Sequence, residues 1–172
     1  MNLEESGMPL RSDWSERPCS IARGIDAVGD PWTLLIIREL ISGVRRFDEI
    51  RESVGVSDKV LANRLRQLVE GGLATRIPYG NASTRRYEYE PTQAGIDALP
   101  ILHAFALWAE KHTPTAGLGQ RLVIVCRDCG RESSRGETCS ECGAVLSADN
   151  VSWIRPISTD RIPKPLGAAV ER

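Results

Sequence analysis

Residues 55–72 read GVSDKVLANRLRQLVEGG and predict one helix with two unlike faces. Ser57 suits the N-cap position, because its hydroxyl can accept a hydrogen bond from a free amide of the first turn. Gly71 and Gly72 favour termination at the other end, since glycine readily takes the left-handed conformation of helix ends. The leucines recur at helical spacing and predict a buried stripe of Leu61, Leu65 and Leu68.

The opposite face of this helix is polar and basic. Its centre carries Lys59, Asn63 and Arg66, and its flanks carry Val60, Ala62 and Gln67. Asparagine and glutamine can pair with the edge of adenine, whereas arginine and lysine can reach guanine or phosphate. An ordinary solvated helix face has a similar composition, so the neighbouring segments have to decide between the two interpretations.

The segments on either side of this helix predict a winged helix-turn-helix. Residues 46–53 favour a shorter helix, and residues 54–57 form a glycine-containing turn into the longer one. Residues 73–78 and 85–90 favour two strands, separated by a polar, turn-rich tip at 79–84. The expected fold class of this part is therefore mostly α with a β wing, an α+β winged helix-turn-helix.

Charge is nearly balanced, with 22 basic and 23 acidic residues, so the composition by itself does not indicate a nucleic-acid partner. The distribution of charge does indicate one. Between residues 59 and 86, one acidic residue, Glu70, stands against six basic ones, which are Lys59, Arg64, Arg66, Arg76, Arg85 and Arg86. Arg45 and Arg46 add to this stripe, which is typical of a surface that faces DNA.

The N-terminal part supplies an arm and a core. Residues 1–16 are polar and aperiodic, which predicts a flexible arm, and residues 19–28 favour a short amphipathic helix. Asp30 can cap the next helix, and Pro31 is tolerated at its first position because the amide that proline lacks is unpaired there. Residues 32–41 are apolar nearly all round, so this helix should be central and buried.

Several linked motifs occur in one order along this part of the chain. They are Cys19, GDPWTLLIIREL at 29–40, RRFDEI at 45–50, VLANRL at 60–65, GGL at 71–73 and RYEY at 86–89. Together they resemble the HxlR family of bacterial transcription regulators, which are relatives of the MarR-type winged-helix proteins. The resemblance covers about residues 19–112. It implies a homodimeric regulator, with repression as the expected mode, whose winged helices enter successive major grooves of an inverted-repeat operator.

For this function the helix after Ser57 would read bases, and the basic residues around it would hold the DNA backbone. The side chains expected to probe base edges are Ser57, Lys59, Val60 and Asn63. The side chains expected to contact phosphate, or to reach into a minor groove, are Arg46, Arg64, Arg66, Arg85 and Arg86.

Residues 91–112 predict the last helical region of this domain, with Thr92 as its cap and Pro100 kinking or dividing it. One face is apolar through Ile96, Leu99, Leu102, Phe105, Ala106 and Ala109, yet Ile101 and Trp108 lie off that face. A monomer of this size has difficulty covering both sides, so we expect packing against the same helix of a second subunit. The resemblance places the dimer interface here, and the alternative is that all these residues face one internal core.

Four cysteines form two C-x-x-C-G repeats, CRDCG at 126–130 and CSECG at 139–143. Thiolates suit a tetrahedral zinc ion, and two cysteines at this spacing can wrap one metal in a tight turn. Apolar strands flank the repeats, so the pattern predicts a small β zinc ribbon at 122–156, with one zinc per chain held by Cys126, Cys129, Cys139 and Cys142. Four thiolates close the coordination sphere, which predicts a structural metal. Two disulfides, or a redox dithiol pair, are the alternatives.

The expected domain organisation follows from these segments. A DNA-binding and dimerisation domain at 17–112 follows the arm, a linker at 113–121 leads to the ribbon, and residues 157–172 form a tail in which Pro163 and Pro165 break any pattern.

Other features limit the function. The N-terminus is acidic where a secretory signal is basic, and the longest apolar run, at 98–109, is too short to span a bilayer, so we expect a cytoplasmic protein without a membrane partner. Only two histidines are present, and no nucleophile triad, phosphate loop or open metal site occurs, so we expect no catalytic residues and no enzyme.

Two alternatives to a plain regulator remain. Cys19 is the one thiol outside the ribbon, and either this thiol or the ribbon could make the protein a redox- or zinc-responsive sensor with an oxidant or small molecule as effector. A partner-binding or RNA-binding adaptor is the other hypothesis, although the chain has few of the aromatic residues that stack on RNA bases.

Overall fold

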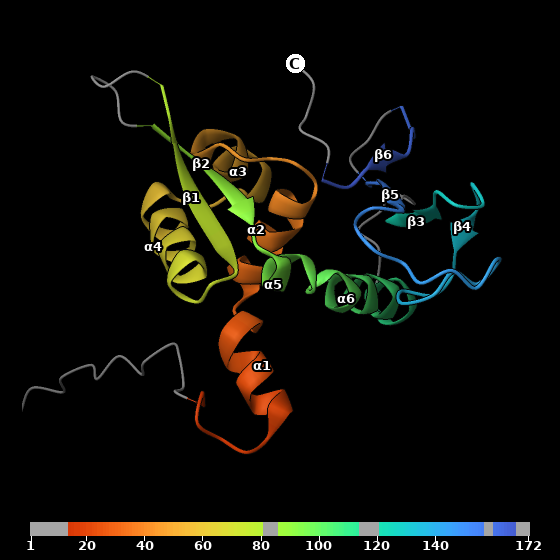
Figure 1. The fold of residues 1–172 in the computed structure, drawn as a ribbon, viewed down its shortest axis with the longest axis horizontal. Coiled ribbons are helices and arrows are strands. Elements are labelled where there is room, and N and C mark those ends of the chain that lie inside the picture. Colours follow the sequence, from red (N-terminus) through yellow and green to blue (C-terminus); the bar gives the residue numbers. More distant parts are fainter. Residues whose placement is uncertain (1–13, 81–85, 114–120, 157–159, 168–172) are drawn as a thin grey trace, which may run out of the picture.

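A computed structural model describes residues 14–80, 86–113, 121–156 and 160–167 (Figure 1). In chain order the elements are α1 (Ser20–Val28), α2 (Pro31–Ile41), α3 (Phe47–Val54), α4 (Asp58–Glu70), β1 (Ala74–Tyr79), β2 (Arg86–Pro91), α5 (Gln93–Ile96), α6 (Leu99–His112), β3 (Val123–Cys126), β4 (Glu132–Ser133), β5 (Val151–Ile154) and β6 (Lys164–Pro165). Within these residues, no helix is long and apolar enough to cross a membrane.

Helix α2 is the centre of the core, as its apolar composition predicts. The Asp30 carboxylate caps it by accepting hydrogen bonds from the amides of Trp32, at 3.0 Å, and Thr33, at 3.2 Å. Its buried apolar side chains are Ile36, Ile37, Leu40 and Ile41, each at most 1% exposed. Helices α3, α4, α5 and α6 and strand β2 all contact α2, so this helix fixes their relative positions.

The helix-turn-helix consists of α3 and α4. Helix α3 ends at Val54, and Gly55 is its C-cap. The φ of Gly55 is 74°, a left-handed conformation that residues with a side chain adopt only with strain. Ser57 then caps α4 by accepting a hydrogen bond from the amide of Val60, at 3.4 Å. The stripe of Leu61, Leu65 and Leu68 is buried, at 0–2% exposure. The predicted two-faced helix is therefore confirmed.

The wing is the antiparallel pair β1–β2, in register from Ala74 opposite Pro91 to Tyr79 opposite Arg86. Each strand begins and ends one residue later than predicted. Residues 81–84 of the predicted tip and Arg85 of the predicted second strand lie outside the described residues. The combination of this hairpin with α2, α3 and α4 confirms the predicted winged helix-turn-helix class.

The helical region after the wing is divided into α5 and α6. Thr92 caps α5, because its hydroxyl accepts a hydrogen bond from the Gly95 amide at 3.3 Å while donating one to the Gly72 carbonyl at 2.6 Å. Pro100 lies in the first turn of α6, where the missing amide has no helical partner to lose. The predicted division at this proline is confirmed.

The C-terminal strands form an antiparallel sheet in the order β4–β3–β5–β6. Strand β6 lies in the segment predicted to be a tail, and this prediction is wrong for residues 164–167. Pro165 is compatible with an edge strand because its missing amide interrupts no inner ladder. Beyond it, Leu166 donates to the Val151 carbonyl at 3.1 Å, and Gly167 donates to the Ile41 carbonyl of α2 at 2.7 Å.

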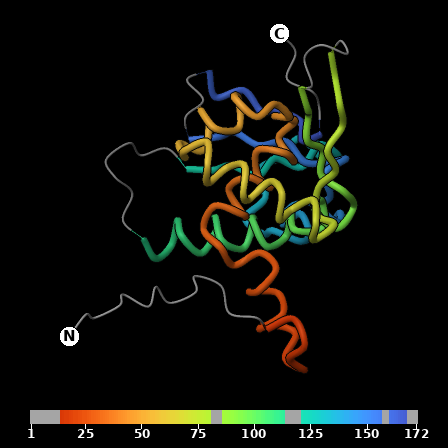
Figure 2. The backbone as a smooth tube through the Cα atoms, turned by 90° about the vertical axis from the view of Figure 1, so that its left-hand side faces the viewer, coloured from red at the N-terminus to blue at the C-terminus, as the bar shows by residue number. Residues whose placement is uncertain are grey.

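The C-terminal sheet and the wing lie at opposite ends of the molecule, with α6 passing beneath the sheet (Figure 1). Helix α1 projects away from the rest of the chain in both ribbon and tube views (Figures 1 and 2). Buried residues from both ends join one hydrophobic core, including Leu40, Leu99 and Trp153. The described part of the chain therefore packs the cysteine-containing segment directly against the winged helix-turn-helix, and residues 114–120 of the predicted linker lie outside it.

Candidate nucleic-acid interface and metal centre

The outward face of α4 is an open surface opposite its buried leucines. Lys59, Ala62 and Arg66 are exposed, and Val60 and Asn63 are half-buried. These five residues, together with Arg64, line an open depression of about 470 Å³. Ser57 is exposed at the start of the same helix. The structure thus brings the residues predicted to probe base edges onto one side of one helix.

Asn63 and Arg66 form a pair on this face. The Arg66 guanidinium donates a hydrogen bond to the Oδ1 atom of Asn63, and its Nε atom lies 3.9 Å from Glu70 Oε1. The pair presents amide and guanidinium donors side by side, which are the groups that recognise bases and phosphates in a major groove.

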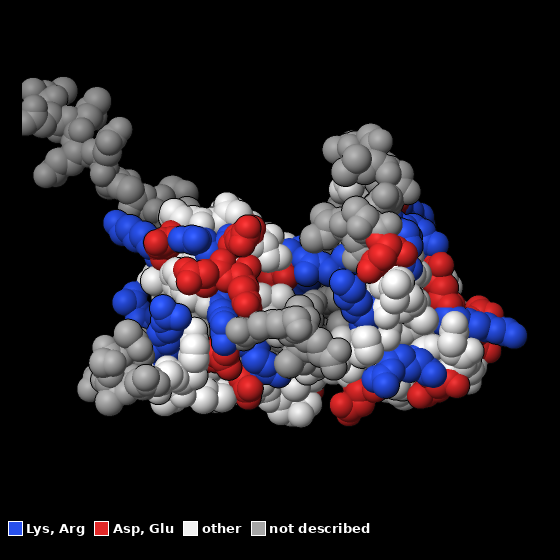
Figure 3. Space-filling model, turned by 90° about the horizontal axis from the view of Figure 1, so that it is seen from above, with Lys and Arg blue, Asp and Glu red and all other residues white. Residues whose placement is uncertain are grey.

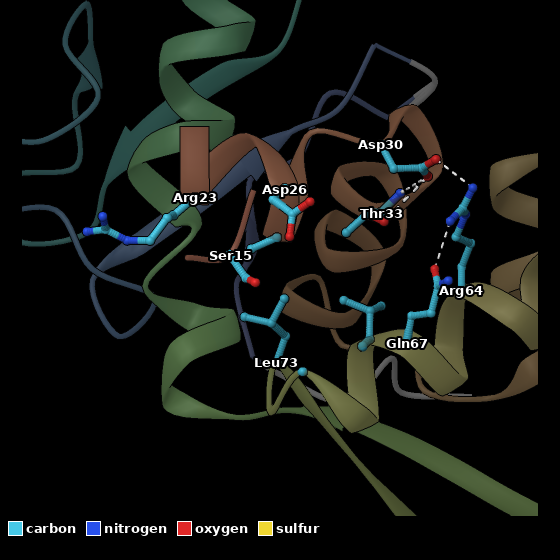
Figure 4. A pocket seen from close by; sticks show the side chains of 11 residues that line it. Ser15, Arg23, Asp26, Asp30, Thr33, Arg64, Gln67 and Leu73 are labelled. Carbon is cyan, nitrogen blue, oxygen red and sulfur yellow. Dashed lines mark hydrogen bonds and ion pairs between the residues drawn. The ribbon is translucent and has the colours of Figure 1, made fainter. Parts of the chain in front are cut away.

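Arg64, predicted to contact phosphate, forms contacts within the protein, and its side chain is only 16% exposed. Its Nη2 atom lies 2.7 Å from Asp30 Oδ2, and its Nη1 atom donates to Gln67 Oε1 at 2.7 Å (Figure 4). The same Asp30 carboxylate caps α2. Arg64 therefore ties α4 to the start of α2 through its guanidinium, although the residue also lines part of the open depression.

A cavity of about 290 Å³ lies behind α4. Residues of α1, α2 and α4 line it, among them Asp26, Thr33 and Arg64, and Leu73, just before β1, also lines it (Figure 4). Asp30 and Arg64, which form the ion pair between α2 and α4, both line this cavity.

Arg46 is also engaged within the protein. Its Nε atom donates to Glu88 Oε1 on β2 at 3.1 Å, and its guanidinium carbon lies 5.0 Å from the centre of the Tyr79 ring. The neighbouring Arg45 forms an ion pair with Glu90 at 2.8 Å. These contacts connect the start of α3 to the wing, a connection that the sequence did not indicate.

The wing carries two further arginines within the described residues. Arg86 is exposed at the start of β2, and the Arg76 guanidinium lies 4.1 Å from the centre of the Tyr87 ring. Arg85 lies outside the described residues. Basic and acidic side chains are interspersed over the face that includes the wing (Figure 3). The ion pairs Arg45–Glu90, Arg46–Glu88 and Arg66–Glu70 partly neutralise the basic stripe.

The four cysteines of the two repeats converge on one point at the end of the C-terminal sheet. Their sulfur atoms all lie within 4.8 Å of one another, and the Cys126–Cys142 and Cys129–Cys139 separations are both 3.8 Å. Sulfurs in a disulfide are only about 2.05 Å apart. A tetrahedral ion with metal–sulfur bonds of about 2.3 Å places its sulfurs about 3.8 Å apart. The cluster therefore fits a metal and not a pair of disulfides.

Each repeat folds as a tight turn around its two cysteines. Gly130 and Gly143 take φ values of 71° and 75°, and their amides donate to the carbonyls of Cys126 and Cys139. Backbone hydrogen bonds from Cys142 and Glu141 lower the pKa of Cys139 to about 7. Desolvation and the neighbouring thiols act in the opposite direction on Cys142, whose pKa is raised to about 12, so the sulfur separations and not the pKa values support a metal site.

His103 of α6 is a residue whose role the sequence did not show. It is fully buried, its Nδ1–H donates to the Gly136 carbonyl at 2.8 Å, and its Nε2 accepts from the Trp153 indole at 2.9 Å. Burial lowers the pKa of its imidazole. The neutral ring therefore connects α6 to two parts of the cysteine-containing segment.

Glu39 of α2 forms a second buried connection. Arg155, just after β5, donates to both carboxylate oxygens at 2.7 and 2.8 Å, and Arg38 lies 2.5 Å from one of them. Burial acts to raise the pKa of Glu39, but the hydrogen bonds and charges of Arg155 and Arg38 outweigh it and lower that pKa. An acid inside an apolar helix was the only signal of this pair in the sequence.

Comparison with known proteins decides the family. The model of the HxlR-like helix-turn-helix family matches residues 27–116. The chain belongs to this family. Its fold and family identify it as a transcriptional regulator with a helix-turn-helix DNA-binding domain.

Similar proteins agree with this assignment. The uncharacterized HTH-type transcriptional regulator Rv3095 of Mycobacterium tuberculosis is 35% identical over 133 residues, which cover 77% of this chain and 83% of Rv3095. The crystal structure of PA1607, a candidate transcription factor, superposes with a TM-score of 0.65 and 31% sequence identity. The match covers 80% of this chain and 94% of the PA1607 chain. The structure of PA1374 of Pseudomonas aeruginosa, also a candidate transcription factor, matches with 37% sequence identity and a TM-score of 0.50. This match covers 75% of this chain and 86% of the PA1374 chain.

Proposed function

We propose that this HxlR-family regulator is a homodimeric repressor that reads an inverted-repeat operator with α4 and the wing. The outward face of α4 carries the proposal, because it presents Lys59, Val60, Asn63 and Arg66 on a helix whose opposite side is anchored in the core. A helix of this kind fits the major groove with its N-terminal residues near base edges.

The contacts with DNA divide by position. Ser57, Lys59, Val60 and Asn63 would probe base edges, while Arg66, Arg86 and Arg85 would contact phosphate or a minor groove. Arg46 and Arg64 are engaged with Glu88 and with Asp30. We therefore give these two arginines the role of positioning the wing and α4.

Exposed apolar side chains support the homodimer. On α1, Ile21 and Ile25 are 72% and 51% exposed, and on α6, Phe105 and Trp108 are both 59% exposed. None of the described residues of α1 is buried, and the helix projects from the rest of the molecule (Figure 2). A second copy would bury these faces about a two-fold axis, which is the symmetry an inverted repeat requires.

The cysteine cluster supports one structural zinc ion per chain. The sulfur separations of 3.8 Å fit a tetrahedral four-thiolate site, and no ligand position would remain open for water. Cys126, Cys129, Cys139 and Cys142 would hold the ion, and zinc would stabilise the short strands around it.

Cys19 offers a redox response as a second candidate function. Its thiol is exposed at the N-cap of α1, the helix that carries the unpartnered isoleucines. Oxidation at this position would change the proposed dimer interface. The test compares operator binding by the wild type and a Cys19→Ser variant after oxidant treatment. If both proteins lose binding to the same extent, the redox response does not depend on Cys19.

The experiment that tests the proposed function is selection of genomic DNA fragments by the purified zinc-loaded protein at near-physiological salt. Enrichment of an inverted repeat, with half-sites about one helical turn apart or a multiple of it, is the expected result. Featureless binding that disappears with salt would contradict sequence-specific reading, and a preference for RNA would favour the adaptor hypothesis.

A further inference from the structure

Helix α6 has two opposite faces in different surroundings. Leu99 and His103 are buried, at 2% and 0% exposure, whereas Ile101, Phe105 and Trp108 are 40–59% exposed. The first face is covered from within the same chain, and the second is the face that the proposed dimer would bury. Helix α6 lies beneath the C-terminal sheet (Figure 1), so in the proposed dimer it would stand between that sheet and the partner subunit.

The inner face of α6 is held by hydrogen bonds that leave no ring nitrogen of His103 unused. Gly136 accepts from one nitrogen, Trp153 donates to the other, and the His103 and Trp153 rings meet edge-on at 5.7 Å. The contact is close as well as polar, since a Cβ atom added to Gly136 would lie 2.7 Å from the Cβ atom of His103.

Both partners of His103 lie in segments next to the cysteine cluster. Gly136 precedes Cys139 by three residues, and Trp153 lies on β5, which pairs with β3 so that Val151 faces Cys126. The strands involved are only two to four residues long. Strands this short are not stable alone, so metal ligation would supply much of the free energy that orders them.

A second connection extends from the same segment to α2. Arg155 follows β5 directly and holds the buried Glu39, and the Gly167 amide donates to the Ile41 carbonyl. The cysteine-containing segment is therefore attached to both α6 and the helix against which α4 packs.

We infer that the four-cysteine module, residues 121–156 and 160–167, is the support of the dimerisation helix, so that loss of its metal is transmitted through His103 to the subunit interface. A metal-loaded module holds α6 in one position before association. Without the metal, α6 has to be ordered when the subunits meet, and the entropy of that ordering weakens the dimer. This inference rests on the proposed homodimer.

The direct test is hydrogen exchange of the full-length reduced protein, with zinc bound and after removal of zinc by a chelator. We expect amides of residues 99–112 to exchange at least about tenfold faster without zinc, while those of residues 61–68 in α4 change much less. Zinc added back should restore protection. Unchanged exchange in α6, or an equal loss of protection in α4, would overturn the inference. This readout does not depend on DNA binding or on dimer formation.

A variant tests the same connection with the metal in place. Gly136→Ala leaves all four cysteines intact but inserts a methyl group against His103. With zinc content confirmed by elemental analysis, we expect faster exchange in α6 and a dimer dissociation constant raised about tenfold. The matched control is Glu137→Ala, which alters the next residue, an exposed one.

The outcomes separate this inference from the proposed function. A Gly136→Ala protein with full zinc, wild-type exchange in α6 and a wild-type dimer would overturn the support role. A zinc-loaded wild-type protein that stays monomeric would instead contradict the proposed homodimer. Hydrogen exchange in α6 would still show whether the four-cysteine module stabilises this helix.

Discussion

Asp30 Oδ2 lies 2.7 Å from Arg64 Nη2, so a single carboxylate caps α2 and holds α4. Both side chains are largely shielded, at 24% and 16% exposure. Asp30 therefore connects α4, the helix proposed to read bases, to the start of α2.

Substitutions of Asp30 should separate its two tasks. Asp30→Asn keeps a capping oxygen but removes the charge, so it should lower operator affinity with little loss of stability. Asp30→Ala removes the cap as well and should cost about 1 kcal/mol more in the free energy of unfolding. Urea unfolding and fluorescence anisotropy measure the two quantities. Equal operator affinity for all three proteins would show that the Asp30–Arg64 pair does not orient α4.

The wing should contribute to binding through charge alone. Arg86→Ala should weaken binding to every DNA sequence and lower the slope of log affinity against log salt by about one. Anisotropy titrations over a range of salt concentrations measure the slope. Arg131→Ala, which removes an exposed arginine of the four-cysteine module, is the control. Identical slopes for Arg86→Ala and the wild type would refute a phosphate contact at this position.

The buried Glu39–Arg155 pair should be sensitive to the loss of one member. Arg155→Ala would leave a carboxylate that is 0% exposed with Arg38 as its remaining cationic partner. Removing one partner of a buried ion pair typically costs about 3 kcal/mol or more. Chemical denaturation of the zinc-loaded protein measures the change, and a loss below about 1 kcal/mol would show that Arg38 and solvent compensate for the missing guanidinium.

His103 should make stability depend on pH. Its pKa is lowered by burial in the native state, so the unfolded chain takes up a proton below about pH 6.5 that the native protein does not bind. The free energy of unfolding should therefore fall as the pH falls from about 6.5 toward the native pKa. His103→Phe removes the titratable group, so the difference in the free energy of unfolding between the wild type and the variant should decrease as the pH falls. Unfolding curves with zinc in excess measure it, and a pH-independent difference would contradict the prediction.

Local patterns were sufficient to predict most of the winged domain. The leucine spacing and Ser57 defined α4, Gly55 defined the turn, and alternating residues defined the wing within one residue. These features depend on side chains close to one another in the chain, so the sequence contains the whole signal. The cysteine spacing likewise predicted four converging thiols.

Contacts between distant segments could not be predicted in the same way. His103 meets partners 33 and 50 residues away, and Glu39 meets Arg155 116 residues away. The ion pair between Arg64 and Asp30 could not be predicted, because only the tertiary structure brings these two residues together. Strand β6 was missed because two residues paired at a sheet edge have no periodicity.

The most decisive measurement is the base preference of the Asn63→Ala and Lys59→Ala variants at every position of the selected operator. If the outward face of α4 reads bases, each variant loses preference at one position in each half-site, at equal distances from the two-fold axis, by about 1–3 kcal/mol, and keeps it elsewhere. If both variants retain the full wild-type preference, or lose affinity equally for all sequences, then α4 is not the element that reads the operator.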